Sequence, residues 1–264
     1  MEDYSELAHA IKSWGKELGF QQIGITDTDL QKHEQHLQSW LLKGFGADML
    51  YMSKHGDKRS RPDLLIPGTI RIVSARMDYL PDDDKIEKTL SSHSKAYIAR
   101  YALGRDYHKV IRARLRALTD RINDHLADLG IPDFSARVFI DSGPVLEKGA
   151  AEKAGLGWIG KNTLLLNEAA GSWFFLGEIY TNIPLPIDEA KTSNRCGSCT
   201  ACMDVCPTKA IVAPYQLDSR LCISYHTIEN RGVIPIAIRE RMGNRIFGCD
   251  DCQAVCPWNR YAHP

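Results

Sequence analysis

The eight cysteines are the residues whose type and spacing most clearly indicate chemistry. They lie at positions 196, 199, 202, 206, 222, 249, 252 and 256. Residues 196–207 read CGSCTACMDVCP, the C-x2-C-x2-C-x3-C-P spacing of bacterial ferredoxins, whose fourth cysteine binds the other cluster of a two-cluster protein. Residues 249–257 read CDDCQAVCP, which lacks one cysteine of that pattern. Cys222 is available to supply it.

Two cubane clusters would use all eight thiolates. The spacing predicts that one 4Fe-4S cluster is bound by Cys196, Cys199, Cys202 and Cys256. The other is then bound by Cys206, Cys222, Cys249 and Cys252. The alternative is a pair of zinc sites, because four cysteines commonly hold zinc. Zinc usually takes two separated C-x2-C pairs, so four cysteines within eleven residues followed by proline favour clusters.

The cysteines follow a longer region in which helical and strand-like patterns alternate. Helices are predicted at residues 4–18, around Leu30–Leu41, and at residues 107–129. Strands are predicted at residues 22–26, 69–79, 95–102, 136–141, 162–167 and 172–181. This alternation predicts a layered α/β (α+β) domain. We place it at residues 1–186, with a two-cluster ferredoxin-like domain at residues 187–264.

The linker between the two domains is predicted near residues 182–194, which are rich in proline and polar residues. An acidic loop, PDDDKIE, is predicted at residues 81–87. The C-terminal module is too small to bury much apolar surface, so we expect its clusters to contribute to its folding.

Composition indicates an ordinary globular protein. The 264 residues include 33 basic and 33 acidic side chains, and no apolar run approaches the ~18 residues of a membrane span. The first residues, MEDYSELAHA, lack the apolar region of a secretory signal, so we expect a cytoplasmic protein without membrane association. Residues 54–76 and 95–121 are locally basic. They could bind phosphate, although a solvated helix face would show the same bias.

Two clusters transfer electrons singly, and the large preceding domain predicts an adjoining redox site. The sequence has neither a GxGxxG fingerprint nor a GxxxxGK(S/T) loop, and the glycine-rich GLGWIGKN at residues 155–162 fits neither pattern. We therefore do not expect an ordinary nucleotide-binding site.

Four segments, together with the cysteine module, resemble the epoxyqueuosine reductase family. They are GDKRSRPDLLIPG (56–68), IARYALGRDYH (98–108), FIDSGPVLEKGAAEKAGLGWIGKN (139–162) and GSWFFLGEIYTNIPLP (171–186). The resemblance runs from about residue 5 to residue 259. It implies a nitroreductase-like cobalamin-binding domain joined to a two-cluster ferredoxin domain. The implied reaction is reduction of epoxyqueuosine to queuosine at the wobble position of tRNAs with a GUN anticodon, those for Tyr, His, Asn and Asp.

The resemblance also implies roles for individual residues. Asp141 matches the family's proton donor, and burial beside an apolar corrin would raise its pKa and keep it protonated. From the residues alone, an aspartate at a strand end is more often a turn former. The match places these residues near cobalamin: Arg59, Ala99, Asp141, Lys161, Asn162, Ser224 and Asp250. No histidine is assigned as a cobalt ligand.

Individual contacts follow from these matches. Arg59 and Lys161 would pair with oxygen atoms of the cobalamin nucleotide tail, although ordinary surface charge is an equal alternative. Ser224 would let the corrin lie against the second cluster. Phosphate contacts to the anticodon stem are expected from Arg105, Lys109, Arg112 and Arg116, while the modified base is flipped into the corrin pocket.

Other expectations concern partners. We expect an external electron donor and a monomer. Many family members continue into a helical-repeat domain that helps hold tRNA, whereas this sequence ends eight residues after Cys256, so we expect weaker tRNA affinity. Two alternatives remain: a reductive dehalogenase-like enzyme, which typically carries an export signal, and an electron-carrier subunit with two clusters but no cobalamin.

Overall fold

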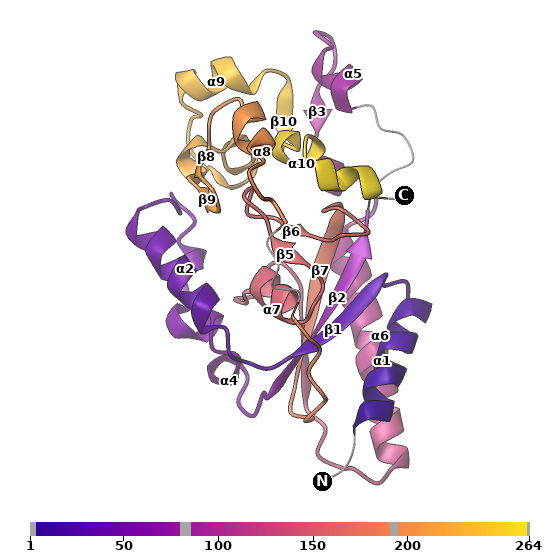
Figure 1. Cartoon of the computed structure of the whole chain (residues 1–264). Helices are drawn as coiled ribbons and strands as arrows, with labels where there is room; N and C mark the ends of the chain where they lie inside the picture. The colour runs from indigo at the N-terminus through magenta and orange to yellow at the C-terminus, as the bar shows by residue number, and fades with distance from the viewer. Residues whose placement is uncertain (1–3, 80–85, 191–194, 263–264) are drawn as a thin grey trace.

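A four-stranded antiparallel sheet forms the centre of the larger part of the computed structural model, which describes residues 4–79, 86–190 and 195–262 (Figure 1). Its strands, in spatial order, are β1 (Gln22–Thr26), β2 (Arg71–Asp78), β7 (Phe174–Thr181) and β4 (Ala136–Phe139). Strands β2 and β7 pair along their full lengths. They are therefore the central strands, and β4 lies at an edge.

Helices α1 (Ser5–Glu17) and α6 (Tyr107–Asp128) cover one face of this sheet (Figure 1). Their apolar residues recur every three or four positions, so each helix buries one side. Ile11, Ile111 and Leu115 are fully buried there against Val73 and Ile179 of the sheet. Helix α6 begins where the side chain of Asp106 accepts a hydrogen bond from the backbone N–H of His108.

The opposite face is covered by the short helix α7 (Glu147–Lys153), which contacts β1, β2 and β7. Around it lie α2 (Gln31–Leu42), α3 (Tyr51–Lys54), the 3₁₀-helix η1 (Gly56–Arg59) and α4 (Pro62–Leu65). A small hairpin of β5 (Trp158–Ile159) and β6 (Leu165–Leu166) follows α7. This face is less apolar, because β2 and β7 bury Ser74 and Glu178 on it.

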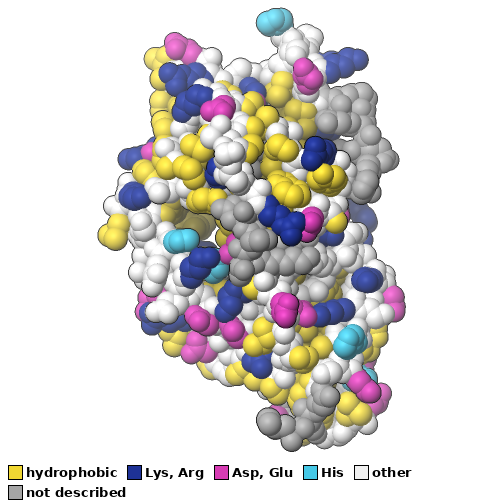
Figure 2. Space-filling model, viewed as in Figure 1, with side chains coloured by type: hydrophobic (Ala, Val, Ile, Leu, Met, Phe, Trp, Pro, Cys, Tyr) yellow, Lys and Arg dark blue, Asp and Glu magenta, His cyan; other side chains and the backbone are white. Residues whose placement is uncertain are grey.

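The cysteine-containing part lies at the top of the molecule in Figure 1. It contains α8 (Ala201–Val205), β8 (Ile211–Ala213), β9 (Gln216–Leu217) and the 3₁₀-helix η3 (Ser219–Leu221). These are followed by the π-helical η4 (Tyr225–Glu229), α9 (Ile236–Met242), β10 (Arg245–Phe247), α10 (Asp251–Ala254) and the 3₁₀-helix η5 (Pro257–Tyr261). Figure 2 shows a hollow between this part and the larger one, and basic and acidic side chains interspersed over the visible face.

The two parts interlock through a segment of the N-terminal half. Helix α5 (Ile86–Leu90), strand β3 (Tyr97–Ile98) and the 3₁₀-helix η2 (Arg100–Ala102) lie with the upper part, where β3 pairs in parallel with β10 (Figure 1). The backbone N–H of Ala99 donates to the carbonyl of Phe247 at 2.8 Å. The proposed division at residues 186 and 187 remains a prediction, and these contacts cross it.

The mixed α and β architecture confirms the predicted fold class, and most predicted helices and strands are present. The strand predicted at residues 95–102 is largely wrong, because only Tyr97–Ile98 is a strand and Arg100–Ala102 is a 3₁₀-helix. Most of the predicted acidic loop and residues 191–194 of the predicted linker lie outside the described residues. Within the described part of the chain, no helix is long and apolar enough to cross a membrane.

Candidate cluster sites and active site

The eight cysteines line two separate cavities. We call the first the outer cavity; its volume is about 190 Å³, and its cysteines are Cys196, Cys199, Cys202 and Cys256. We call the second the inner cavity; its volume is about 370 Å³, and its cysteines are Cys206, Cys222, Cys249 and Cys252. All eight are free thiols. The structure thus groups the cysteines in the same two sets of four as the spacing does.

Local folding explains how each motif contributes to both cavities. Each cysteine motif runs into a short helix, α8 or α10, and these two helices pack against each other. Cys206 directly follows α8, Cys256 lies two residues after the end of α10, and each precedes a proline that cannot continue the helix. Cys206 accepts a hydrogen bond at Sγ from the backbone N–H of Ala210 at 3.2 Å. The last cysteine of each motif therefore lines the cavity of the other motif.

Each set of four thiols surrounds a cavity, as a cluster of several iron atoms requires. Within residues 4–79, 86–190 and 195–262, no group of three or more His, Cys, Asp or Glu side chains is placed to hold one metal ion. Burial raises the pKa values of Cys222, Cys249 and Cys252, so they are neutral thiols until iron displaces their protons.

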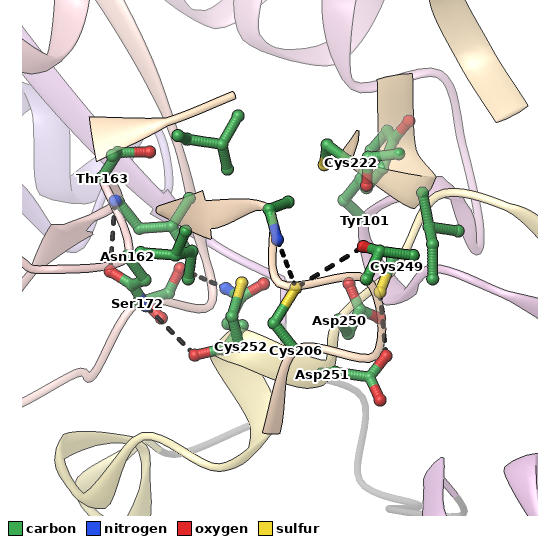
Figure 3. A pocket seen from close by; sticks show the side chains of 18 of the residues that line it. Tyr101, Asn162, Thr163, Ser172, Cys206, Cys222, Cys249, Asp250, Asp251 and Cys252 are labelled. Atoms are coloured by element: carbon green, nitrogen blue, oxygen red, sulfur yellow. Dashed lines mark hydrogen bonds between the residues drawn. The ribbon is translucent and has the colours of Figure 1, made fainter. Parts of the chain in front are cut away.

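The inner cavity lies where the two parts of the molecule meet, and Figure 3 shows its cysteines around it. The larger part contributes Tyr79, Tyr107, Phe174 and Phe175 to an aromatic wall, and Tyr101 of η2 completes it. The cysteine-containing part contributes the apolar residues Ile211, Leu217 and Ile223. A thiol-lined base facing broad aromatic and apolar surfaces suits a cluster beneath a large, flat, mostly apolar cofactor.

Three of the residues predicted to contact cobalamin, Asn162, Ser224 and Asp250, line the inner cavity. Asn162 Nδ2 donates to the carbonyl of Cys252 at 3.1 Å. Asp250 is 3% exposed, and its Oδ2 accepts hydrogen bonds from the Tyr97 hydroxyl at 2.6 Å and the backbone N–H of Arg100 at 2.7 Å. Burial raises the pKa of Asp250. These contacts show that Asp250 also fastens β3 and η2 to the upper part.

Three other predicted contacts lie elsewhere. Lys161 lines the outer cavity, where its Nζ donates to the carbonyls of Gly197 at 2.6 Å and Cys199 at 2.9 Å. Arg59 is 6% exposed and donates from Nη2 to the carbonyl of Tyr51 at 2.7 Å, so it is not ordinary surface charge. Ala99 is buried.

Asp141 follows β4 in a left-handed backbone conformation, with φ of 40°. Its Oδ2 accepts a hydrogen bond from the Tyr107 hydroxyl at 2.6 Å and lies 3.0 Å from His108 Nε2. Because Tyr107 also lines the inner cavity, Asp141 is one side chain away from it. The Asp141 side chain is 53% exposed at the end of the edge strand β4, and its burial beside cobalamin remains a prediction.

Several groups around Asp141 were not identified from the sequence. Tyr107 and His108 lie in the IARYALGRDYH segment, and His108 Nδ1 is 3.1 Å from Asp106 Oδ1. Burial, followed by the adjacent Asp141 carboxylate, raises the pKa of Tyr107, so its hydroxyl remains a donor. Glu147 accepts the backbone N–H of Asp141 at 3.2 Å. All of these residues lie in the segments that resemble the family, but only the fold shows which of their side chains contact one another.

A groove of about 540 Å³ lies beside residues 140–146, which join β4 to α7 and which we call the Asp141 loop. It is lined by Arg112 and Arg116 of α6 and by Arg137 of β4, and it continues to Ser142 and Gly143. Arg105 and Lys109 lie near the start of α6, and Lys109 Nζ is 3.9 Å from Asp106 Oδ2. The structure therefore brings two of the four predicted phosphate contacts together and adds Arg137.

Two family models match the chain. The description "Epoxyqueuosine reductase QueG, DUF1730" applies to residues 59–142, and "4Fe-4S double cluster binding domain" applies to residues 195–259. The second match covers all eight cysteines, so the chain carries a domain for two 4Fe-4S clusters.

Curated relatives match almost the whole chain. An epoxyqueuosine reductase of Pseudomonas aeruginosa is 59% identical over 262 residues, which cover 99% of this chain and 71% of that protein. The epoxyqueuosine reductase of Escherichia coli is 54% identical over 260 residues, covering 98% of this chain and 67% of the relative.

Solved structures agree. An epoxyqueuosine reductase bound to an epoxyqueuosine-modified tRNA-Tyr stem loop has a TM-score of 0.85 at 32% identity, covering 98% of this chain and 68% of that one. The Bacillus subtilis enzyme, captured with an aspartate catalytic loop swung out of the active site, has a TM-score of 0.85 at 31% identity with the same coverage. A catabolic reductive dehalogenase shares the fold, with a TM-score of 0.60 at 19% identity over 99% of this chain and 33% of its own. The chain belongs to the epoxyqueuosine reductase family.

Proposed function

We propose that this chain reduces the epoxide of epoxyqueuosine in tRNA to the alkene of queuosine, with electrons supplied through two 4Fe-4S clusters and cobalamin. Family membership at 59% identity over nearly the whole chain supports this reaction. The structural observation that carries the proposal is the inner cavity, where four thiols face an aromatic wall that connects through Tyr107 to Asp141.

The two sets of cysteines have different surroundings, which suggests an order for electron transfer. Cys199 of the outer set is exposed, whereas all four cysteines of the inner set are only partly exposed. We therefore assign the outer set to the cluster that accepts electrons from an external donor and the inner set to the cluster next to the substrate. When bound, cobalamin supplies a strongly reducing cobalt centre to the substrate.

Cobalamin would lie against the inner cavity. Its aromatic wall suits the corrin, and Asn162, Ser224 and Asp250 provide polar groups at the edge. Arg59 has an unpartnered, buried Nε among the described residues and could reach a polar group of the cofactor or substrate. Contacts from Ala99 and Lys161 remain predictions, and Lys161 is placed to hold the outer cysteine loop instead.

Asp141 would protonate the epoxide oxygen as its carbon–oxygen bond breaks. The overall reaction consumes two electrons and two protons and releases the oxygen as water. Tyr107 and His108 hold the Asp141 carboxyl from the side of α6. The exposed position of Asp141 leaves room for the substrate, whose arrival would exclude water from the carboxyl.

The tRNA would lie along the groove beside the Asp141 loop, with the modified base flipped towards the inner cavity. We propose that Arg112, Arg116 and Arg137 contact phosphates there, and that Arg105 and Lys109 extend the basic surface toward the start of α6. Recognition of a GUN anticodon, a monomeric state, an external electron donor and a cytoplasmic location complete the proposal.

The test is anaerobic turnover of tRNA carrying epoxyqueuosine. The protein is reconstituted with iron and sulfide and given cobalamin and a chemical reductant, and the nucleosides are analysed by mass spectrometry. We expect cobalamin-dependent loss of the mass of one oxygen. If both clusters are intact and cobalamin is bound but no conversion occurs, the proposal that epoxyqueuosine in tRNA is the substrate is contradicted. Conversion of a halogenated compound would favour the dehalogenase alternative. Absence of cobalamin binding would favour an electron carrier.

Substitution of Asp141 tests its role in that assay. Asp141→Ala should retain both clusters and cobalamin affinity while losing turnover by at least ~100-fold, because general acids contribute about that much or more. Absorption spectra report the clusters, and a cobalamin titration reports the cofactor. Full turnover in this variant would remove Asp141 from the mechanism.

A further inference from the structure

Two glutamates, the partly buried Glu147 and the fully buried Glu178, lie outside the cluster and cofactor sites. Glu147 is the first residue of α7, and its Oε2 accepts the backbone N–H of Asp141 at 3.2 Å. Glu178 lies on the central strand β7, opposite Phe139 of β4 in the strand register. Glu147 contacts the loop directly, and Glu178 interacts electrostatically with Glu147.

Glu178 is buried without polar compensation. Its side chain is 0% exposed, and neither carboxyl oxygen has a hydrogen-bond partner among the described residues. The hydroxyl of Ser74, its neighbour on β2, is also buried and unpartnered there. An ionised carboxylate in such surroundings would be very costly, so Glu178 carries a proton. Burial, and then the adjacent Glu147, raise the pKa of Glu178 accordingly.

Glu147 is the member of the pair that can change charge near neutral pH. Burial and then Asp141 raise its pKa to about 7, while Lys148, the Asp141 N–H and His108 oppose the shift. Other groups that interact with it electrostatically are Arg59, Tyr107, Glu178 and Tyr180. Above pH ~7 the carboxylate predominates and accepts a charge-assisted hydrogen bond, and below that pH it is increasingly neutral.

The conformation of Asp141 makes this hydrogen bond important. A non-glycine residue with φ of 40° is strained, and it stays in that conformation only where its surroundings hold it. The side chain is held by Tyr107 and His108, and the backbone is held by Glu147. If Glu147 loses its charge, the backbone contact weakens and the loop can leave the active site.

We propose that Glu147 is a positioning residue whose carboxylate, backed by protonated Glu178, holds the Asp141 loop in the active site and releases it when protonated. The swung-out aspartate loop of the Bacillus subtilis relative shows that a loop of this kind has a second position in that protein. The consequence for turnover rests on the proposed role of Asp141, whereas the effect on the loop does not.

Hydrogen exchange of the loop tests the proposal without substrate. In the cluster-loaded protein, and after correction for intrinsic exchange, protection of the peptide spanning residues 139–146 should fall about fivefold between about pH 8 and pH 6. In Glu147→Gln the neutral amide mimics the protonated acid and cannot titrate, so protection should stay at its low, acid-side level at both pH values. In Glu147→Ala protection should be low at both pH values. Unchanged, pH-dependent protection in both variants would overturn the proposal.

Turnover supplies the second readout. Glu147→Ala should lower kcat about tenfold with KM for tRNA little changed. Glu147→Gln, which mimics the neutral acid, should hold kcat near the low value of the unmodified protein at acid pH and remove the part of the pH dependence due to Glu147. Glu178→Gln replaces a neutral carboxyl by a neutral amide and should leave the exchange profile unchanged, whereas a changed profile would mean that Glu178 is the ionised partner. If Asp141→Ala kept full turnover, the catalytic role of the loop would fail, but the exchange result would still stand.

Glu152→Gln is the matched control. Glu152 lies on the same helix and also accepts a backbone N–H, that of Ile159 at 2.7 Å, but it lies beside His33 rather than Asp141. Its substitution should leave loop exchange and its pH dependence unchanged. A change as large as that of Glu147→Gln would show that any loss of charge on α7 loosens the loop, which would contradict a specific role for Glu147.

Discussion

Tyr107 shows at the scale of single residues how the cofactor cavity and the proton donor are connected. Its ring stacks on Phe175 with centroids 4.1 Å apart and on His108 with centroids 4.0 Å apart. The stack fixes the hydroxyl 2.6 Å from Asp141 Oδ2. One side chain therefore forms part of the cavity wall and orients the carboxyl.

Tyr107→Phe separates these two roles, because phenylalanine keeps the stack and removes only the donor. We expect kcat to fall about tenfold, with cobalamin affinity and KM for tRNA nearly unchanged. Steady-state kinetics with a cobalamin titration measure all three quantities. Tyr261→Phe, an exposed tyrosine outside this cavity, is the control. If Tyr107→Phe lowered cobalamin affinity as much as kcat, the hydroxyl would bind the cofactor rather than orient Asp141.

Single residues also show what the sequence can reveal. The cysteines were grouped correctly in two sets because cluster geometry imposes short, regular spacings along the chain. Asp141 emerged only through a family resemblance, because an aspartate at a strand end is by itself an ordinary turn residue. Glu147 and Tyr107 were missed as partners of Asp141 because tertiary structure alone brings their segments together.

At the scale of elements, the contact between α6 and β7 depends on one residue without a side chain. A Cβ added at Gly177 of β7 would lie 2.8 Å from Ile111 Cγ2 and 2.8 Å from Leu115 Cδ1. Both of these side chains are fully buried in α6. The helix that carries Tyr107 and His108 at its start can therefore lie close to the sheet only where β7 has glycine.

Gly177→Ala should lower the free energy of unfolding by about 1–3 kcal/mol, because the extra methyl overpacks a filled core. Urea denaturation followed by far-UV circular dichroism measures the change. Gly232→Ala, in a loop with open surroundings and no positive φ, should change stability by less than ~0.5 kcal/mol. Equal effects of the two substitutions would contradict tight packing at Gly177.

Elements with strong periodicity were predicted well, and those that depend on distant partners were not. Helix α6 has apolar residues at helical spacing over its whole length, so residues 107–129 were predicted almost to the residue. The strand predicted at residues 95–102 failed because only Tyr97 and Ile98 find a partner, in β10. Strand formation depends on such pairing more than on local composition.

At the scale of the whole molecule, zero net charge conceals a local concentration of arginine. Arg112, Arg116 and Arg137 line one groove beside the Asp141 loop although the chain has equal numbers of basic and acidic residues. Phosphate binding at this groove would orient tRNA without selecting a sequence.

Arg137→Gln should weaken binding of an anticodon stem loop to a similar degree whatever its sequence. It should also reduce the slope of log K against log salt concentration by about one, because one phosphate contact is lost. Fluorescence anisotropy across a salt series measures both effects. Arg121→Gln, on α6 but paired with Glu17, removes the same charge outside the groove. An unchanged slope for Arg137→Gln would place the tRNA elsewhere.

The pairing of β3 with β10 has a consequence for synthesis on the ribosome. Tyr97 and Ile98 emerge about 150 residues before the strand that they pair with. At ~5–20 residues per second, this segment waits about 8–30 s for its partner. During that interval the nascent chain exposes an unpaired strand edge and an unfinished aromatic wall, so its N-terminal half depends on residues translated much later.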